Sequence, residues 1–159
     1  MHSSNPGLHQ FESEPGRRER KRLQTLDHLA DTAHRLFEAL GFETVTMEQI
    51  AAEADVAKGT LYNHFPVKEA LLAHRVHRDL AEHAPGLRDA MRKLPGFGAR
   101  MAYLVQASCH WAESHRNDLP HYLRYRLAHT QIDASPHAPR SGLDQIVEAL
   151  IVSGQEAGE

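Results

Sequence analysis

Apolar residues recur three and four positions apart along most of this chain, which is the spacing that places one apolar stripe on a helix. Strict alternation of apolar and polar residues, the pattern of a half-buried strand, does not extend over a useful length. The clearest apolar stripe consists of Leu26, Leu29, Ala30, Ala33, Phe37 and Leu40. A glycine, Gly41, follows this stripe where a left-handed helix cap would lie. The sequence therefore predicts an all-α fold.

Prolines and glycines divide the remaining sequence into further expected helices. Their expected ends are marked by Pro66, by Pro85 with Gly86, by Pro95 with Gly96, and by Gly154. After the first stripe we expect helices at about 47–54, 58–64, 67–83, 87–94, 97–115, 118–127 and 143–152. Residues 131–140 contain two prolines and are expected to form a loop.

The charge and the cysteine content exclude several classes of protein. Lys and Arg total 18 against 21 Asp and Glu, a net charge of −3, so any surface that binds nucleic acid must be a local patch. Cys109 is the single cysteine, which excludes an intramolecular disulfide and a paired-cysteine zinc motif. No apolar run reaches the roughly eighteen residues of a membrane helix, and the N-terminus lacks the apolar core of a secretory signal. We expect a cytoplasmic protein with no membrane partner.

Residues 46–68 combine two short expected helices with a tight break between them. Thr46 and Gln49 have the spacing of a capping box, which would start the first of the two helices. The second helix is expected over Lys58 to His64, with Val56, Leu61 and Phe65 facing inward. Its outer side would present Lys58, Gly59, Thr60, Tyr62, Asn63 and His64. This arrangement predicts a helix-turn-helix, which places its second helix in the major groove of DNA.

The run IAAEADVAKGTLYNHFPVKEALL resembles the N-terminal signature of TetR-type transcriptional regulators, and the resemblance covers about residues 26–72. Its sharpest part is the spacing of Leu61, Tyr62, Phe65 and Lys68. The resemblance implies a three-helix helix-turn-helix domain at residues 17–66. Residues 1–16 show no periodicity and are expected to form a disordered tail. A helical domain for ligand binding and dimerisation would follow at residues 67–159.

The same resemblance implies which residues contact DNA and which partners the chain has. By resemblance the contacts are Thr46, Ala57, Lys58, Gly59, Thr60, Tyr62, Asn63, His64 and Lys68, together with Arg18 and Arg22 of a basic run. Among these, Thr46, Tyr62 and Lys68 would contact phosphates, and the basic run 17–22 would lie along phosphates or in the minor groove. The implied partners are double-stranded DNA with a palindromic operator, a second copy in a homodimer, and a small-molecule effector that relieves repression.

The sequence departs from the family pattern at three places. Asp55 lies where the family usually has a glycine in the turn, and aspartate can adopt the left-handed conformation. Val67 lies where a side-chain helix cap is usual. Family members usually continue beyond the last expected helix into two further helices. The alternative function is therefore a shortened helical module that acts as a dominant-negative dimerisation partner without binding an operator itself.

Several of these residues also have plainer interpretations. Thr46 could be only a helix cap, Tyr62 could pack against the first helix, and the basic run could be a solvated helix start. Candidates for a ligand cavity, with ordinary core as the alternative, are Met101, Leu104, Val105, Ser108, Trp111, Tyr122 and Tyr125.

The 13 histidines raise the question of metal binding and catalysis. His74 and His77 are one turn apart, and Cys109 with His110 lies near His115. Only helix packing could bring these two sets together into a metal site, which needs three or four converging ligands. The sequence contains no glycine-rich phosphate loop, no Ser-His-Asp ordering and no carboxylate cluster with metal spacing. We expect no catalytic residue, no metal and no cofactor.

Overall fold

The computed structural model of the chain describes residues 16–129 and 142–158. Over these residues it consists of helices without strands, which confirms the all-α prediction. The seven helices of the described ranges are α1 Arg17–Leu40, α2 Met47–Glu53, α3 Lys58–His64, α4 Lys68–Arg92, α5 Gly96–Ser114, α6 Leu119–His129 and α7 Gly142–Ala157. The expected tail, apart from Gly16, and the expected loop at 131–140 lie outside the described residues.

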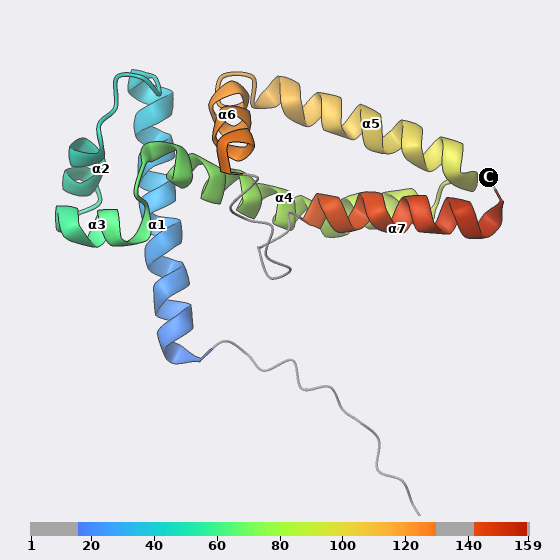
Figure 1. Cartoon of the computed structure of the whole chain (residues 1–159), viewed down its shortest axis with the longest axis horizontal. Coiled ribbons are helices and arrows are strands. Elements are labelled where there is room, and N and C mark those ends of the chain that lie inside the picture. Colours follow the sequence, from blue (N-terminus) through green and yellow to red (C-terminus); the bar gives the residue numbers. More distant parts are fainter. Residues whose placement is uncertain (1–15, 130–141, 159) are drawn as a thin grey trace, which may run out of the picture.

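The first three helices pack as a small domain at one end of the long helix α4 (Figure 1). Helix α1 buries the predicted stripe except for its last member, Leu40, which is half exposed. Gly41 then ends α1 with φ at +84°, and its N–H bonds the carbonyl oxygen of Phe37. The buried stripe meets α2, α3 and the first half of α4 in one core, which contains Ile50, Leu61 and Leu71.

Helix α4 is one continuous helix of 25 residues, so the prediction that Pro85 and Gly86 end it is wrong. Proline removes one backbone N–H donor and usually breaks or kinks a helix. Here the residues on either side of Pro85 are held by burial, because Ala84 and Met91 belong to a second core with α5 and α7. The burial of this apolar face outweighs the lost hydrogen bond, so the expected separate segment at 87–94 is the C-terminal part of α4.

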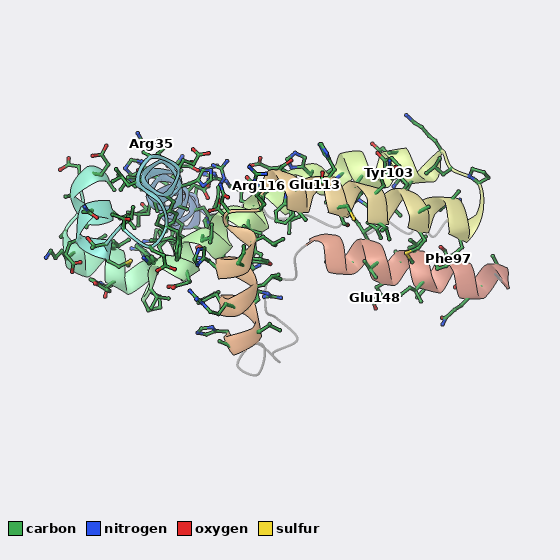
Figure 2. All side chains as sticks on the ribbon, turned by 90° about the horizontal axis from the view of Figure 1, so that it is seen from above. Arg35, Phe97, Tyr103, Glu113, Arg116 and Glu148 are labelled. Atoms are coloured by element: carbon green, nitrogen blue, oxygen red, sulfur yellow. The ribbon has the colours of Figure 1, made fainter. Side chains whose placement is uncertain are left out.

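Helices α5 and α7 run along the second half of α4, and α6 crosses the first half of α4 (Figure 1). Their shared core contains Leu104, Ile146 and Leu150. The prediction that Gly154 stops the last helix is wrong, because α7 continues to Ala157. The ring of Phe97 from α5 lies against this glycine (Figure 2), and a Cβ built there would stand 2.7 Å from the Cδ2 atom. Gly154 therefore permits close helix packing.

The candidate cavity residues on α5 are only partly buried. Leu104 is buried and Met101 and Trp111 are partly buried, whereas Val105 is 54% exposed and Ser108 is also exposed. Successive residues of a helix are about 100° apart, so Val105 lies about a quarter turn from Leu104 and outside the buried stripe. These five candidate residues of α5 therefore do not share one buried face.

Candidate nucleic-acid interface

The turn between α2 and α3 has the conformation that a helix-turn-helix requires. Asp55 has φ at +53°, the only positive value among the described non-glycine residues. Aspartate therefore takes the left-handed conformation that glycine would otherwise supply in this turn. The next residue, Val56, donates its N–H to the carbonyl oxygen of Ala51 at 3.0 Å. The chain then turns directly into α3, which begins and ends where the sequence predicted.

Helix α3 has a buried inner side and a polar outer side that faces solvent. Leu61 is completely buried, Phe65 is buried and Val56 is partly buried, as predicted. The exposed residues on the other side are Ala57, Lys58, Gly59, Thr60, Tyr62 and Asn63, and His64 is half buried. No heavy atom would lie within 4 Å of a Cβ at Gly59, so the backbone there is open to a partner.

Thr46 forms the predicted capping box at the start of α2. Its Oγ1 atom accepts the N–H of Gln49 at 3.2 Å, and its own N–H donates to the Gln49 Oε1 atom at 2.8 Å. The Thr46 hydroxyl also lies 3.3 Å from that Oε1 atom. The structure therefore assigns Thr46 a capping role, and its contact with phosphate stays a prediction.

Tyr62 projects from α3 with 44% of its surface exposed and does not take the alternative position against α1. Its hydroxyl donates to the Oε1 atom of Glu48 on α2 at 3.4 Å. Lys58, also on α3, has its Nζ atom 3.9 Å from the same carboxylate oxygen. Desolvation, the negative charge of Glu48 and the hydrogen bond to it together raise the pKa of the Tyr62 hydroxyl. Nothing in the sequence pattern identified Glu48 as the partner of these two residues.

Lys68 does not point to solvent, contrary to the expectation for a phosphate contact. Its ammonium donates to the carbonyl oxygens of Phe42, Glu43 and Val45 at 2.7, 3.2 and 3.2 Å. An ammonium has three donors, so these three carbonyls can satisfy all of them. Lys68 therefore ties the loop between α1 and α2 to the start of α4. Val67 makes no side-chain cap hydrogen bond, so Lys68 fastens the start of α4 without capping its N–H groups.

The basic run 17–22 forms the first turns of α1. Arg22 donates to the carboxylate of Glu19 at 2.9 Å on the exposed surface. Arg18 is exposed. A DNA contact by Arg18 or Arg22 stays a prediction, and it would be made from a helix.

An ion-pair network joins α1 of the three-helix domain to the first half of α4. Asp31 of α1 accepts a hydrogen bond of 2.6 Å from Arg75 and a further one from Arg78. Asp27, one turn earlier, lies 2.8 Å from the Nε2 atom of His74. Burial raises the pKa of the Asp31 carboxyl, but the hydrogen bonds from Arg78 and Arg75 outweigh burial, so the pKa lies below its ordinary value. The network fixes the orientation of the three-helix domain on α4.

A cavity of about 810 Å³ opens between α4, α5 and α6. Ser108, Trp111 and Tyr122 line it as expected, whereas Met101, Leu104, Val105 and Tyr125 are not part of its wall. Sequence reasoning missed the contribution of α4, which includes Asp79 and His83. These residues carry no motif, and only the packing of α4 against α5 and α6 places them at the cavity. Ligand binding in this cavity stays a prediction.

The histidine pairs do not converge. His74 faces Asp27, and the Nε2 atom of His77 lies 3.0 Å from the hydroxyl of Tyr122. Over residues 16–129 and 142–158, no group of three or more His, Cys, Asp or Glu side chains could hold a metal ion. Cys109 is exposed. Among the described helices, none combines the length and the apolarity that a membrane crossing requires.

Helices α1, α2 and α3 have the geometry of a helix-turn-helix, a motif that places its second helix in the DNA major groove. Residues 29–74 match the family model described as bacterial regulatory proteins, tetR family. This match agrees with the resemblance of the signature run to TetR-type regulators, over residues 29–74.

Two curated relatives from Staphylococcus aureus are similar to this segment. An HTH-type transcriptional regulator of the bovine strain RF122 is 36% identical over 58 residues, which are 36% of this chain and 31% of the relative. One from strain USA300 is 40% identical over 52 residues, which are 33% of this chain and 28% of the relative. The chain therefore spans under a third of the length of these relatives.

Two solved structures are similar over more of the chain. Thermus thermophilus FadR, a TetR family transcriptional repressor in complex with lauroyl-CoA, has a TM-score of 0.65 at 22% identity and covers 84% of this chain and 69% of that one. A structure from Shewanella sp. PV-4, assigned to the tetR family of transcription regulators, has a TM-score of 0.50 at 27% identity. It covers 85% of this chain and 72% of that one. The FadR likeness shows that the helices after α3 share the fold of a TetR-family protein.

Proposed function

We propose that this protein is a transcriptional repressor that binds DNA by inserting α3 into the major groove. The observation that carries the proposal is the amphipathic character of α3. Its apolar residues are buried in the core of the three-helix domain, and its polar residues are open to solvent. A helix of only two turns is not stable alone, so this burial is what holds the polar side in position.

The exposed residues divide into those suited to bases and those suited to phosphates. Thr60 and Asn63 carry short groups that can reach base edges from the outer side of α3. Lys58 and Tyr62 offer an ammonium and a hydroxyl to the phosphate backbone. The open backbone at Gly59 allows a close approach to the DNA. Lys68 has no part in this contact, because its ammonium is used inside the protein.

A homodimer would bind a palindromic operator. A two-fold axis relates two α3 helices and two half-sites, which lie about 34–36 Å apart when successive major grooves are read. Such a regulator would act in the cytoplasm, where it meets DNA. The family assignment of residues 29–74 supports this mode of binding.

A small-molecule effector would bind in the cavity and relieve repression. Two contacts connect the cavity to the DNA-binding domain. Asp79 lines the cavity and pairs with Arg75 at 3.1 Å, and Arg75 pairs with Asp31 of α1. Helix α6 also lines the cavity, and its His121 ring stacks on Phe42 with centroids 4.1 Å apart. An effector that binds one arrangement of these helices better than another would shift the population between them.

The experiment that tests the function is selection of bound sequences from a random DNA library, followed by affinity measurements on four variants. We expect Tyr62→Ala to weaken binding to all sequences and Thr60→Val or Asn63→Ala to change the preferred sequence. Gln106→Ala on the exposed side of α5 is the matched control and should change neither. Unchanged affinity and preference in all three variants of α3, with the helical circular dichroism intact, would reject the proposed interface. A protein that binds no DNA but forms heterodimers with a longer relative would instead be the dimerisation module.

A further inference from the structure

One carboxylate faces the two groups of α3 that are suited to phosphate. The Oε1 atom of Glu48 lies 3.4 Å from the Tyr62 hydroxyl and 3.9 Å from the Lys58 Nζ atom. All three side chains are exposed, and they belong to the two helices of the helix-turn-helix. The contact therefore joins α2 to the outer side of α3 on the surface that the proposed function assigns to DNA.

A carboxylate oxygen and a phosphate oxygen compete for the same kind of partner. Each is an anionic acceptor that binds an ammonium or a hydroxyl. A phosphate that approaches Tyr62 and Lys58 must therefore displace Glu48 or share their donors with it. The displaced carboxylate also remains near the phosphate, and two like charges at this separation repel each other.

We propose that Glu48 is an intramolecular competitor for the phosphate-binding groups and sets the overall affinity of the protein for DNA. The proposal rests on the proposed function, because it assumes that Tyr62 and Lys58 contact phosphates. The competition acts on the phosphate contacts, which are common to all sequences, and not on base reading. Glu48 therefore weakens binding to random DNA and to a preferred site by a similar factor. The competition by Glu48 thereby weakens the attraction to phosphates that would otherwise hold the protein on random DNA.

The test compares the full chain with Glu48→Gln and with Glu53→Gln. Both variants remove one exposed negative charge from α2, but residue 53 lies at the opposite end of the helix from the Tyr62 and Lys58 contact. Affinity is measured by fluorescence anisotropy with a random-sequence duplex and with a duplex selected from a library. We expect Glu48→Gln to strengthen binding to both duplexes about 3- to 10-fold at low salt, with the gain shrinking as salt is added. Glu53→Gln should give a clearly smaller gain.

Three results would overturn the proposal. Weaker binding by Glu48→Gln would mean that Glu48 positions Tyr62 and Lys58 for DNA. A change confined to the selected duplex would mean that Glu48 reads a base. Equal gains in Glu48→Gln and Glu53→Gln would mean that only net charge matters.

A readout without DNA separates this proposal from the proposed function. Glu48 contributes to the raised pKa of the Tyr62 hydroxyl, so Glu48→Gln should move that pKa toward its ordinary value, as followed by NMR of the labelled tyrosine ring. A moved pKa without salt-dependent DNA binding by either protein would overturn both proposals while confirming the contact. If the pKa of Tyr62 does not move and both proteins bind DNA normally, the proposal for Glu48 is overturned and the proposed function stands.

Discussion

The Nζ atom of Lys68 lies 2.7 Å from the carbonyl oxygen of Phe42 and 4.6 Å from the centre of its aromatic ring. The ring of Phe42 also packs against Phe37 of α1 and stacks on His121 of α6. The first residue of α4 is thereby fastened to the loop that precedes the helix-turn-helix. Lys68, for which the family resemblance implied a phosphate contact, ties the start of α4 to the loop between α1 and α2.

Lys68→Met removes this tie while keeping the apolar part of the side chain. We expect the free energy of unfolding to fall by about 2–3 kcal/mol, because three backbone carbonyls lose a charged donor. Urea denaturation measures the change. The dependence of DNA affinity on salt should keep its slope, since no phosphate contact is lost.

Lys58→Met is the matched variant for the lysine that the proposed function places at the DNA. Its side chain is 66% exposed, so stability should be unchanged within error. The salt slope should become shallower by about 1 for each copy bound. The opposite outcome, a shallower slope for Lys68→Met and an unchanged slope for Lys58→Met, would restore Lys68 as the phosphate contact.

Gly154→Ala should destabilise the protein by about 1–3 kcal/mol, because its Cβ would stand 2.7 Å from the Phe97 ring and force the two helices apart. Gly98→Ala is the control in α5, where no heavy atom lies within 4 Å of the added Cβ. That substitution should stabilise the helix by about 0.5–1 kcal/mol. Thermal unfolding followed by circular dichroism distinguishes the two. If both glycine variants gain stability, Gly154 is not a packing position.

Asp31→Asn tests the ion-pair network between α1 and α4. The pKa of Asp31 is lowered in the folded protein, so its contribution to stability is complete above about pH 4 and is lost as the pH falls through the lowered value. We expect the variant to lose at most about 1 kcal/mol at pH 7, because 45% of the side chain is exposed. The difference from the wild type should close as the pH falls through the lowered pKa of Asp31.

The control for Asp31 is Asp89→Asn, which removes an exposed pair with Arg92 within α4. Its effect on the free energy of unfolding should be close to zero at every pH. A difference between wild type and Asp31→Asn that persists unchanged in acid would show that the carboxylate charge is not what stabilises the α1–α4 contact.

Local signals in the sequence predicted the helix-turn-helix. The capping box of Thr46 and Gln49, the left-handed Asp55 and the limits of α3 each depend on a few neighbouring residues, and the structure confirms them. The inward positions of Leu61 and Phe65 follow from helical periodicity, and they are also confirmed. Short-range chemistry is sufficient for these features, because the residues that decide them are neighbours in the sequence.

Features that depend on distant partners were not predictable in this way. Neighbouring residues alone predict that helices end at Pro85 and Gly154. In the structure α4 and α7 continue past these residues, because both helices are buried against other helices. The position of the Lys68 ammonium depends on a loop 23 to 26 residues earlier. The contact of Glu48 with Tyr62 likewise requires the packed geometry of α2 on α3.

The salt dependence of DNA affinity tests most directly whether the outer side of α3 binds nucleotides. Anisotropy titrations of a labelled duplex between about 50 and 200 mM NaCl give the slope of log affinity against log salt concentration. We predict a slope near −7 for a dimer that contacts about eight phosphates, and a slope shallower by about 2 for Lys58→Met, which removes one contact from each protomer. A flat response, or one that Lys58→Met leaves unchanged, would contradict the assignment of this surface to DNA.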